Sequence, residues 1–208
     1  MQSKNIKSGM SIIEVIVAIF IFTMGMASIY LVITSSLNLN EYGKNQIIAS
    51  NLAREGLELV KNLRDSNYAN MHDWNLLNPN LEDNFESNKI ETGVYYKVEI
   101  DYDIVYPDFS VKLSKIDDFK EGKGYVENQM HNYELCLDLE KKYTHNCVGN
   151  RKSKFFRYVK FEDLKYKSNT GDEILVNDAY KVISKVIWYK KGYHEINLTT
   201  ILANHKRL

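Results

Sequence analysis

Apolar residues crowd the first part of the chain and thin out abruptly after it. From Met10 to about Leu37 most positions are apolar, and Glu14 is the one formally charged residue in this run. A helix needs about 20 residues to cross the hydrocarbon core of a membrane, whereas the apolar region of a cleaved secretory signal has only about 7–15. The run therefore predicts a membrane-spanning helix over residues 10–38.

Residues 39–66 keep the helical period but are apolar on one face only. Spacings of four, seven and four residues separate the apolar positions Ile48, Leu52, Leu59 and Leu63. Polar residues occupy much of the remaining surface, so the pattern predicts an amphipathic continuation of the same helix. One helix of more than about 50 residues would be about 80 Å long. The Asn, Asp and Pro residues that follow predict its end.

After residue 67 the period of the apolar residues changes from 3.6 to 2, which is typical of half-buried antiparallel strands. The alternation is clear in residues 94–104, 180–188 and 196–202, and weaker in 109–114, 133–139 and 155–163. A short connection containing Gly192 predicts a hairpin between the two strands nearest the C-terminus. We expect an α+β fold in which an antiparallel sheet in the β-rich domain 67–208 packs on the amphipathic half of the helix.

The distribution of charge predicts an orientation in the membrane. The chain has 27 basic and 27 acidic residues, so its net charge does not favour nucleic acid or an anionic surface as a partner. Lys4 and Lys7 precede the apolar run, and basic residues of this kind stay on the cytoplasmic side. We expect a single-pass protein of the cytoplasmic membrane, with its N-terminus inside and the chain after Asn40 outside.

The two cysteines, Cys136 and Cys147, then lie on the oxidising side of the membrane in most bacteria. A disulfide between them would contribute about 3 kcal/mol by restricting the unfolded chain. A metal site is the alternative, because His131 and His145 flank the pair, but their spacings do not match the common zinc motifs. Two free thiols are the third alternative. We predict the disulfide, with no metal and no cofactor.

Residues 151–160 alternate basic with aromatic side chains, a combination that binds single-stranded nucleic acid through phosphate contacts and base stacking. The candidate contact residues are Arg151, Lys152, Lys154, Arg157 and Lys160. An ordinary strand with a solvated basic face explains the same pattern, and the neutral net charge favours that interpretation. Nucleic acid is therefore kept only as the partner of an alternative function.

Catalytic motifs do not support an enzyme. The sequence has no nucleophile elbow, no zinc-protease helix motif and no glycine-rich phosphate loop. The five histidines are scattered among polar neighbours without partner spacing. We predict that the chain is not an enzyme.

Glu14 has two interpretations. It is either a carboxylate tolerated near the cytoplasmic end of the membrane helix or a group that needs a positive partner. A cut after Gly9 would place a new amine on Met10, about one helical turn from Glu14 of the same chain. In an assembly, that amine would also be available to Glu14 of a neighbouring subunit.

The stretch "KSGMSIIEVIVAIFIFTMGM" resembles the N-terminal signature of type IV prepilins and pseudopilins. Those proteins have a short basic leader that ends in glycine, a cut immediately after it, and glutamate at the fifth mature position. Gly9, Met10 and Glu14 match these three positions. The resemblance implies that residues 1–9 are a leader removed by a prepilin peptidase, which also N-methylates Met10. It also implies the pilin fold.

Two later stretches, "ASNLAREGLELVKNLRDSNY" and "VISKVIWYKKGYHEINLTTIL", resemble PilV-like minor pilins. The resemblance implies a structural subunit, a minor pilin, of a type IV pilus-like filament. Its partners would be the prepilin peptidase, other pilin subunits, the assembly machinery and membrane lipid before assembly. The alternative is a pseudopilin or tip module of a type II secretion or DNA-uptake system that binds substrate or DNA. The final location would be an extracellular filament or a periplasmic pseudopilus.

Overall fold

The computed structural model describes residues 11–78, 88–101, 110–117, 119, 130–169 and 171–205. The chain forms two compact units, Met1–Asn45 and Gln46–Leu208. Helix α1, Ile12–Ala69, is common to both units, and the sheet belongs to the second. The predicted α+β class is thus confirmed, with one long N-terminal helix followed by an antiparallel sheet.

In the first unit, the described part of α1 carries an apolar surface. Large apolar side chains from Ile12 to Leu39 are exposed, most of them by more than half. The helix is long and apolar enough to cross a membrane. An apolar surface of this extent is covered by lipid or by other protein, because water does not solvate it favourably.

In the second unit, α1 has one buried face, as its sequence period predicts. The buried positions include Leu52, Leu59 and Leu63, each less than 9% exposed. Gly56 lies on the same face, where a Cβ atom would come within 2.5 Å of the Ser184 Oγ. Glycine therefore allows the helix backbone to approach the sheet closely at this position.

The helix ends at Ala69, beyond the predicted end at residue 66. Asn67 is fully buried, and its Nδ2 donates to the carbonyl oxygens of Trp74 and Leu76. Tyr68 is also buried, and its hydroxyl donates to Asn204 Oδ1 over 2.6 Å. These contacts hold the last helical turn in place, so tertiary packing extends the helix into a sequence rich in turn-forming residues.

The strands form one antiparallel sheet: β1 Tyr95–Asp101, β2 Ser110–Lys115, β3 Glu134–Leu137, β4 Tyr143–Thr144, β5 Arg151–Lys167, β6 Glu173–Tyr189 and β7 Tyr193–Ala203, with a short 3₁₀ helix, η1, at Met130–Tyr133. Strand β5 is central. One of its edges pairs first with β3 and then with β1, and the other edge pairs with β6. Strand β2 extends the sheet beyond β1, β4 beyond β3, and β7 beyond β6.

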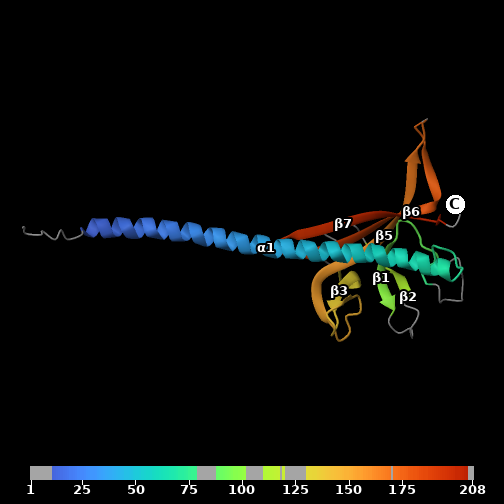
Figure 1. Ribbon diagram of the computed structural model, residues 1–208, viewed down its shortest axis with the longest axis horizontal. Coiled ribbons are helices and arrows are strands. Elements are labelled where there is room, and N and C mark those ends of the chain that lie inside the picture. Colours follow the sequence, from blue (N-terminus) through green and yellow to red (C-terminus); the bar gives the residue numbers. More distant parts are fainter. Residues whose placement is uncertain are drawn as a thin grey trace, which may run out of the picture. The chain divides into compact units, whose positions relative to one another are not determined.

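The predicted C-terminal hairpin is confirmed. Tyr189 of β6 pairs with Tyr193 of β7, and the turn between them has positive φ at Lys191 and Gly192. Strands β5 and β6 also form a hairpin, and each has 17 residues, more than the predicted strand patterns 155–163 and 180–188. Its register shifts between Asp163 and Lys165, and the part beyond the shift projects from the rest of the sheet as an exposed arm (Figure 1).

Both faces of the sheet are covered around β5. One face packs on α1, and its buried residues on β5 are Phe155, Val159 and Phe161. The opposite face carries a second, aromatic cluster that includes Tyr158 of β5 together with Tyr133 and Ile187. Because β5 is buried on both sides, it is apolar at odd and even positions, which weakens its alternation in the sequence.

Deleting the apolar segment should leave the second unit folded on its own. A chain lacking residues 1–39 should be soluble and folded, because it keeps the whole helical face that packs on the sheet. A chain lacking residues 1–63 should aggregate, because the inner face of the sheet is then uncovered. Circular dichroism and size-exclusion chromatography of the two fragments check this. Equal folding of both would show that the helix does not stabilise the sheet.

Candidate functional site

Of the three residues of the predicted processing motif, the structure describes only Glu14. Gly9 and Met10 lie outside the described residues, so the predicted cut between them stays a prediction. Glu14 is in the first turn of α1, and its side chain is exposed among apolar neighbours. A carboxylate in the first turn interacts favourably with the positive end of the helix dipole. The exposed carboxylate is accessible to a positively charged group of another molecule.

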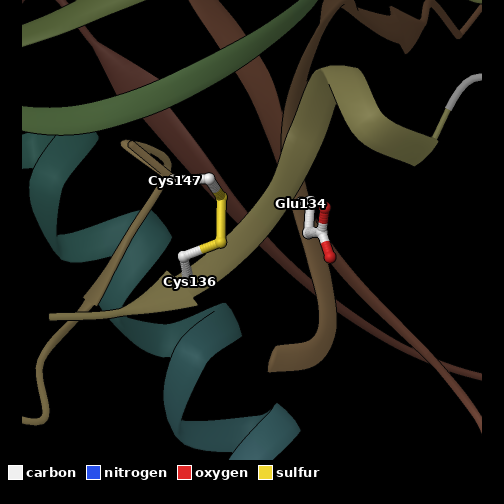
Figure 2. A group of neighbouring side chains, drawn as sticks. All are labelled: Glu134, Cys136 and Cys147. Atoms are coloured by element: carbon white, nitrogen blue, oxygen red, sulfur yellow. A yellow bond between two sulfur atoms is a disulfide. The ribbon is translucent and has the colours of Figure 1, made fainter. Parts of the chain in front are cut away.

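The structure contains a disulfide between Cys136 and Cys147, with the two Cα atoms 5.3 Å apart. Cys136 is fully buried on β3, and Cys147 lies in the loop that follows β4 (Figure 2). Backbone pairing of β3 with β4 accompanies the covalent link. We call the segment 137–146, which the disulfide closes, the disulfide loop.

His145 fastens the disulfide loop to the rest of the second unit. Its Nδ1 lies 3.1 Å from the Glu134 carbonyl oxygen, so Nδ1 carries the proton and donates. Burial, and then the positive charge of Arg157, lower the pKa of His145 to about 3. The imidazole is therefore neutral at physiological pH. Its Nδ1 is committed to a carbonyl oxygen and is not free to bind a metal.

Arg157 joins the helix to the sheet. Its guanidinium is buried and donates to the carbonyl oxygens of Leu52 on α1 and Val98 on β1, each over 3.2 Å. Glu55 Oε1 lies 3.3 Å from its Nη1. Burial lowers the pKa of Arg157 and the Glu55 carboxylate opposes that shift. An ion pair and two hydrogen bonds thus connect three elements of the second unit.

Arg157, one of the residues considered for the alternative of nucleic-acid contact, faces the helix and is 2% exposed, so its guanidinium is not presented at the surface. Two of the three aromatic residues in this stretch, Phe155 and Tyr158, are each only 2% exposed, and Phe156 is partly exposed. Lys160 lies 3.1 Å from Glu162 and 5.2 Å from the ring centre of Tyr95. It therefore takes part in packing on the sheet.

The three other predicted bases, Arg151, Lys152 and Lys154, are exposed. Lys152 makes a 3.0 Å ion pair with Glu134, and Lys154 lies over the ring of Phe155. Three exposed bases, two of them already paired or packed, fit the solvated face of an ordinary strand better than a groove for single-stranded nucleic acid.

Glu134 is a site residue that the sequence analysis missed. It lies two positions before Cys136 on the same strand, and the pairing of β3 with β5 shifts register between these two residues. A carboxylate oxygen of Glu134 and the Sγ atoms of both cysteines lie within 4.8 Å of one another. The spacing Glu-x-Cys on a predicted strand was the available signal.

The N-terminal segment was compared with protein-family models. Residues 4–30 match the family described as "Prokaryotic N-terminal methylation motif". The chain carries the type IV prepilin signature. Comparison with curated proteins and with solved structures gives no match. The prepilin motif includes Gly9, Met10 and Glu14 and the start of the apolar helix.

The prepilin motif covers only the N-terminal part of the chain, residues 4–30. The motif indicates a precursor of the type IV pilin or pseudopilin kind, and it implies processing by a prepilin peptidase and assembly with other pilins. Proteins with this motif are structural subunits and are not known as enzymes. The motif and the apolar part of α1 fit anchoring in a membrane before assembly.

Removing the disulfide should destabilise the second unit. Replacing both cysteines by alanine, or reducing them, should lower the free energy of unfolding by about 3 kcal/mol, because the link across a separation of 11 residues no longer restricts the unfolded chain. Urea unfolding of the fragment lacking residues 1–39 measures this. The oxidised wild-type fragment is the reference, and the reduced wild-type fragment should unfold like the double variant. An unchanged midpoint in both would contradict the prediction.

Proposed function

We propose that this chain is a minor pilin of a type IV pilus-like filament. The peptidase cuts after Gly9 and methylates the new N-terminus at Met10, and the mature chain is stored in the cytoplasmic membrane with its N-terminus inside. The observation that carries the proposal is the methylation motif at residues 4–30, followed directly by the exposed apolar part of α1. The resemblance of two later stretches to minor pilins favours the minor role.

Assembly uses packing and one charge pair. The apolar side chains between Ile12 and Leu39 are in contact with lipid before assembly and with neighbouring helices in the filament. Cleavage creates an amine at Met10, and this amine pairs with Glu14 of a neighbouring subunit. The attraction is strong because little water screens charges inside an apolar bundle. The chain catalyses no reaction in this scheme.

The second unit lies outside the membrane and is displayed on the filament. Its disulfide suits an oxidising compartment, where such bonds persist. We assign it no nucleic-acid ligand, because Arg157 is buried and Phe155 and Tyr158 are not available for stacking. The same processing would serve a secretion pseudopilus, and the fraction of subunit sheared from the cell surface distinguishes a long filament from a periplasmic one.

Processing is the decisive test. The mass of the intact protein isolated from its native membrane should show the loss of residues 1–9 and the gain of one methyl group. A Gly9→Val variant should keep the full leader, because a β-branched residue replaces the small residue before the cut. Wild-type protein with an intact N-terminus would exclude the proposed function.

A further inference from the structure

Strand β7 forms a long open edge of the sheet. It has 11 residues and pairs with β6 on one side without a register shift, and in the described part of the chain no strand pairs with its other side. The other end strands differ from it. Strand β4 has only 2 residues, and on β2 the backbone N–H of Leu113 donates to the Leu77 carbonyl oxygen. An open edge is a template for another strand, so β7 is the part of this sheet suited to strand addition.

Hydrogen bonds at the two ends of the β6–β7 ladder show which backbone groups of β7 point outward. Asn204 N donates to the Asp178 carbonyl oxygen, and Lys190 N donates to that of Gly192. Both pairs continue the register of the ladder. Because bonded and non-bonded pairs alternate in an antiparallel ladder, the even-numbered residues of β7 bond to β6 and the odd-numbered ones direct N–H and C=O away from it. The outward residues are Glu195, Asn197, Thr199, Ile201 and Ala203.

The edge lacks the features that usually prevent strand addition. Strand β7 contains no proline and no lysine, and its one acidic residue, Glu195, lies 3.3 Å from Lys185 on β6. Within the described residues, the outward backbone groups have no hydrogen-bond partner. Ile196 and Leu198 pack against the core but are only partly buried, and Ile201 is 57% exposed. A strand paired with β7 would bond the outward groups and cover these side chains.

We propose that β7 pairs antiparallel with β7 of a second copy of the chain. Centring the pairing on Thr199 places each Thr199 opposite its counterpart and Asn197 opposite Ile201 of the second copy. Every outward N–H then faces an outward C=O, which allows about ten hydrogen bonds. On the side that faces the helix, Ile196 lies opposite Leu202 of the second copy, and apolar cross-strand pairs of this kind stabilise a sheet.

The distribution of charge on β7 allows this self-pairing. Glu195 lies opposite Ala203 of the second copy, so the two Glu195 carboxylates are eight residues apart, about 26 Å along the strand. Both copies use the same surface, as in other two-fold dimers. A strand with its charge at the centre of the pairing would repel its own copy, and β7 has an uncharged threonine there.

The symmetry of the pairing determines which copies can meet. The two-fold axis of an antiparallel strand pair is perpendicular to the sheet, and α1 packs on the face of the sheet. The α1 segments of the two second units therefore run in opposite directions. Chains anchored in one membrane leave it in the same direction. On the proposed function, on which this step rests, β7 pairing thus joins copies anchored in different membranes or filaments.

The full-length chain in lipid nanodiscs, with at most one copy per disc, tests the proposal because pairing then joins two discs. Sedimentation velocity should show pairs of discs whose fraction rises with concentration. Thr199→Lys places like charges opposite each other and should weaken the association by about fivefold or more. Thr199→Val keeps a β-branched residue and should associate like the wild type.

Single cysteines test the register of the pairing. Under mild oxidation Thr199→Cys should form a disulfide between copies, because the Cα atoms of directly opposed residues are about 5.5 Å apart. Asn197→Cys alone should not, because its counterpart lies about 13 Å away along the strand. A mixture of Asn197→Cys and Ile201→Cys discs should cross-link. The native cysteines do not interfere, because both are in the Cys136–Cys147 disulfide.

Ile174→Lys is the matched control for a different surface. Ile174 is 40% exposed on the arm of β5 and β6, beyond the part of β6 that pairs with β7. This variant should associate like the wild type. The proposal is overturned if wild-type discs sediment singly at every concentration, if Ile174→Lys abolishes the association, if Thr199→Lys that is folded by circular dichroism does not weaken it, or if cross-linking does not follow the register. Disc pairing needs no leader cleavage, so it fails or succeeds independently of the test of the proposed function.

Discussion

Replacing Arg157 by alanine should lower the free energy of unfolding of the second unit by about 3 kcal/mol or more. The side chain is almost fully buried, so its removal leaves a large cavity between helix and sheet. The carbonyl oxygen of Val98 also loses the donor at Nη2. Urea unfolding of the fragment lacking residues 1–39, followed through the buried Trp188, measures the loss.

Two further variants show whether the guanidinium itself matters. Arg157→Lys keeps the charge, but its single nitrogen cannot reach both Leu52 and Val98, so we expect most of the destabilisation to remain. Arg151→Ala removes an exposed base from the same strand and should change stability by less than about 0.5 kcal/mol. If Arg157→Ala and Arg151→Ala were equally stable, the buried arginine would not hold helix and sheet together.

Glu14 should be essential for assembly and dispensable for processing. Glu14→Gln keeps the shape of the side chain and removes its charge, and Glu14→Val removes hydrogen bonding as well. In the proposed filament either change leaves a neighbour's amine buried without its partner, so incorporation should fall by more than about tenfold. The cut after Gly9 should persist, because the peptidase mainly needs the glycine.

Shearing the filaments from cells and comparing the sheared fraction with the membrane fraction measures incorporation. Glu58→Gln is the control, since Glu58 is an exposed acid of α1 in the second unit that pairs with Lys61. This variant should assemble normally. Normal incorporation of both Glu14 variants would mean that the carboxylate is only tolerated at the end of the membrane helix.

The sequence predicts the elements whose periods are regular. Helical spacing identifies Leu52, Leu59 and Leu63 as the buried face of α1, and alternation with Gly192 between the strands identifies the C-terminal hairpin. These features depend on local geometry, which fixes the faces of a single helix or a single hairpin. The processing motif is equally local, because all its residues are close together in the chain.

The environment of β5 could not be predicted from the local sequence period. In the sequence, Arg157 is one of several bases that a solvated strand face would explain. It nevertheless alternates in step with Phe155 and Val159, which are buried on the face toward the helix. Its burial depends on α1 and β1, which are distant in the sequence and provide Leu52 and Val98 as acceptors. Similarly, the approach of Glu134 to both cysteines depends on the pairing of β3 with β4. Long-range pairing of this kind leaves little local signal.

The central position of β5 has a consequence for the order of folding. Strands β1 and β3 precede β5 in the chain and both pair with it, so neither completes its hydrogen bonding in the sheet before residues 151–167 arrive. The helix is synthesised first, and its face at Leu52–Leu63 stays uncovered until the sheet forms. Contacts between residues so far apart in sequence form slowly, and uncovered apolar surface promotes aggregation. In the proposed orientation, a chain that stalls before β5 has emerged would present an uncovered apolar helix face outside the membrane, where it promotes aggregation.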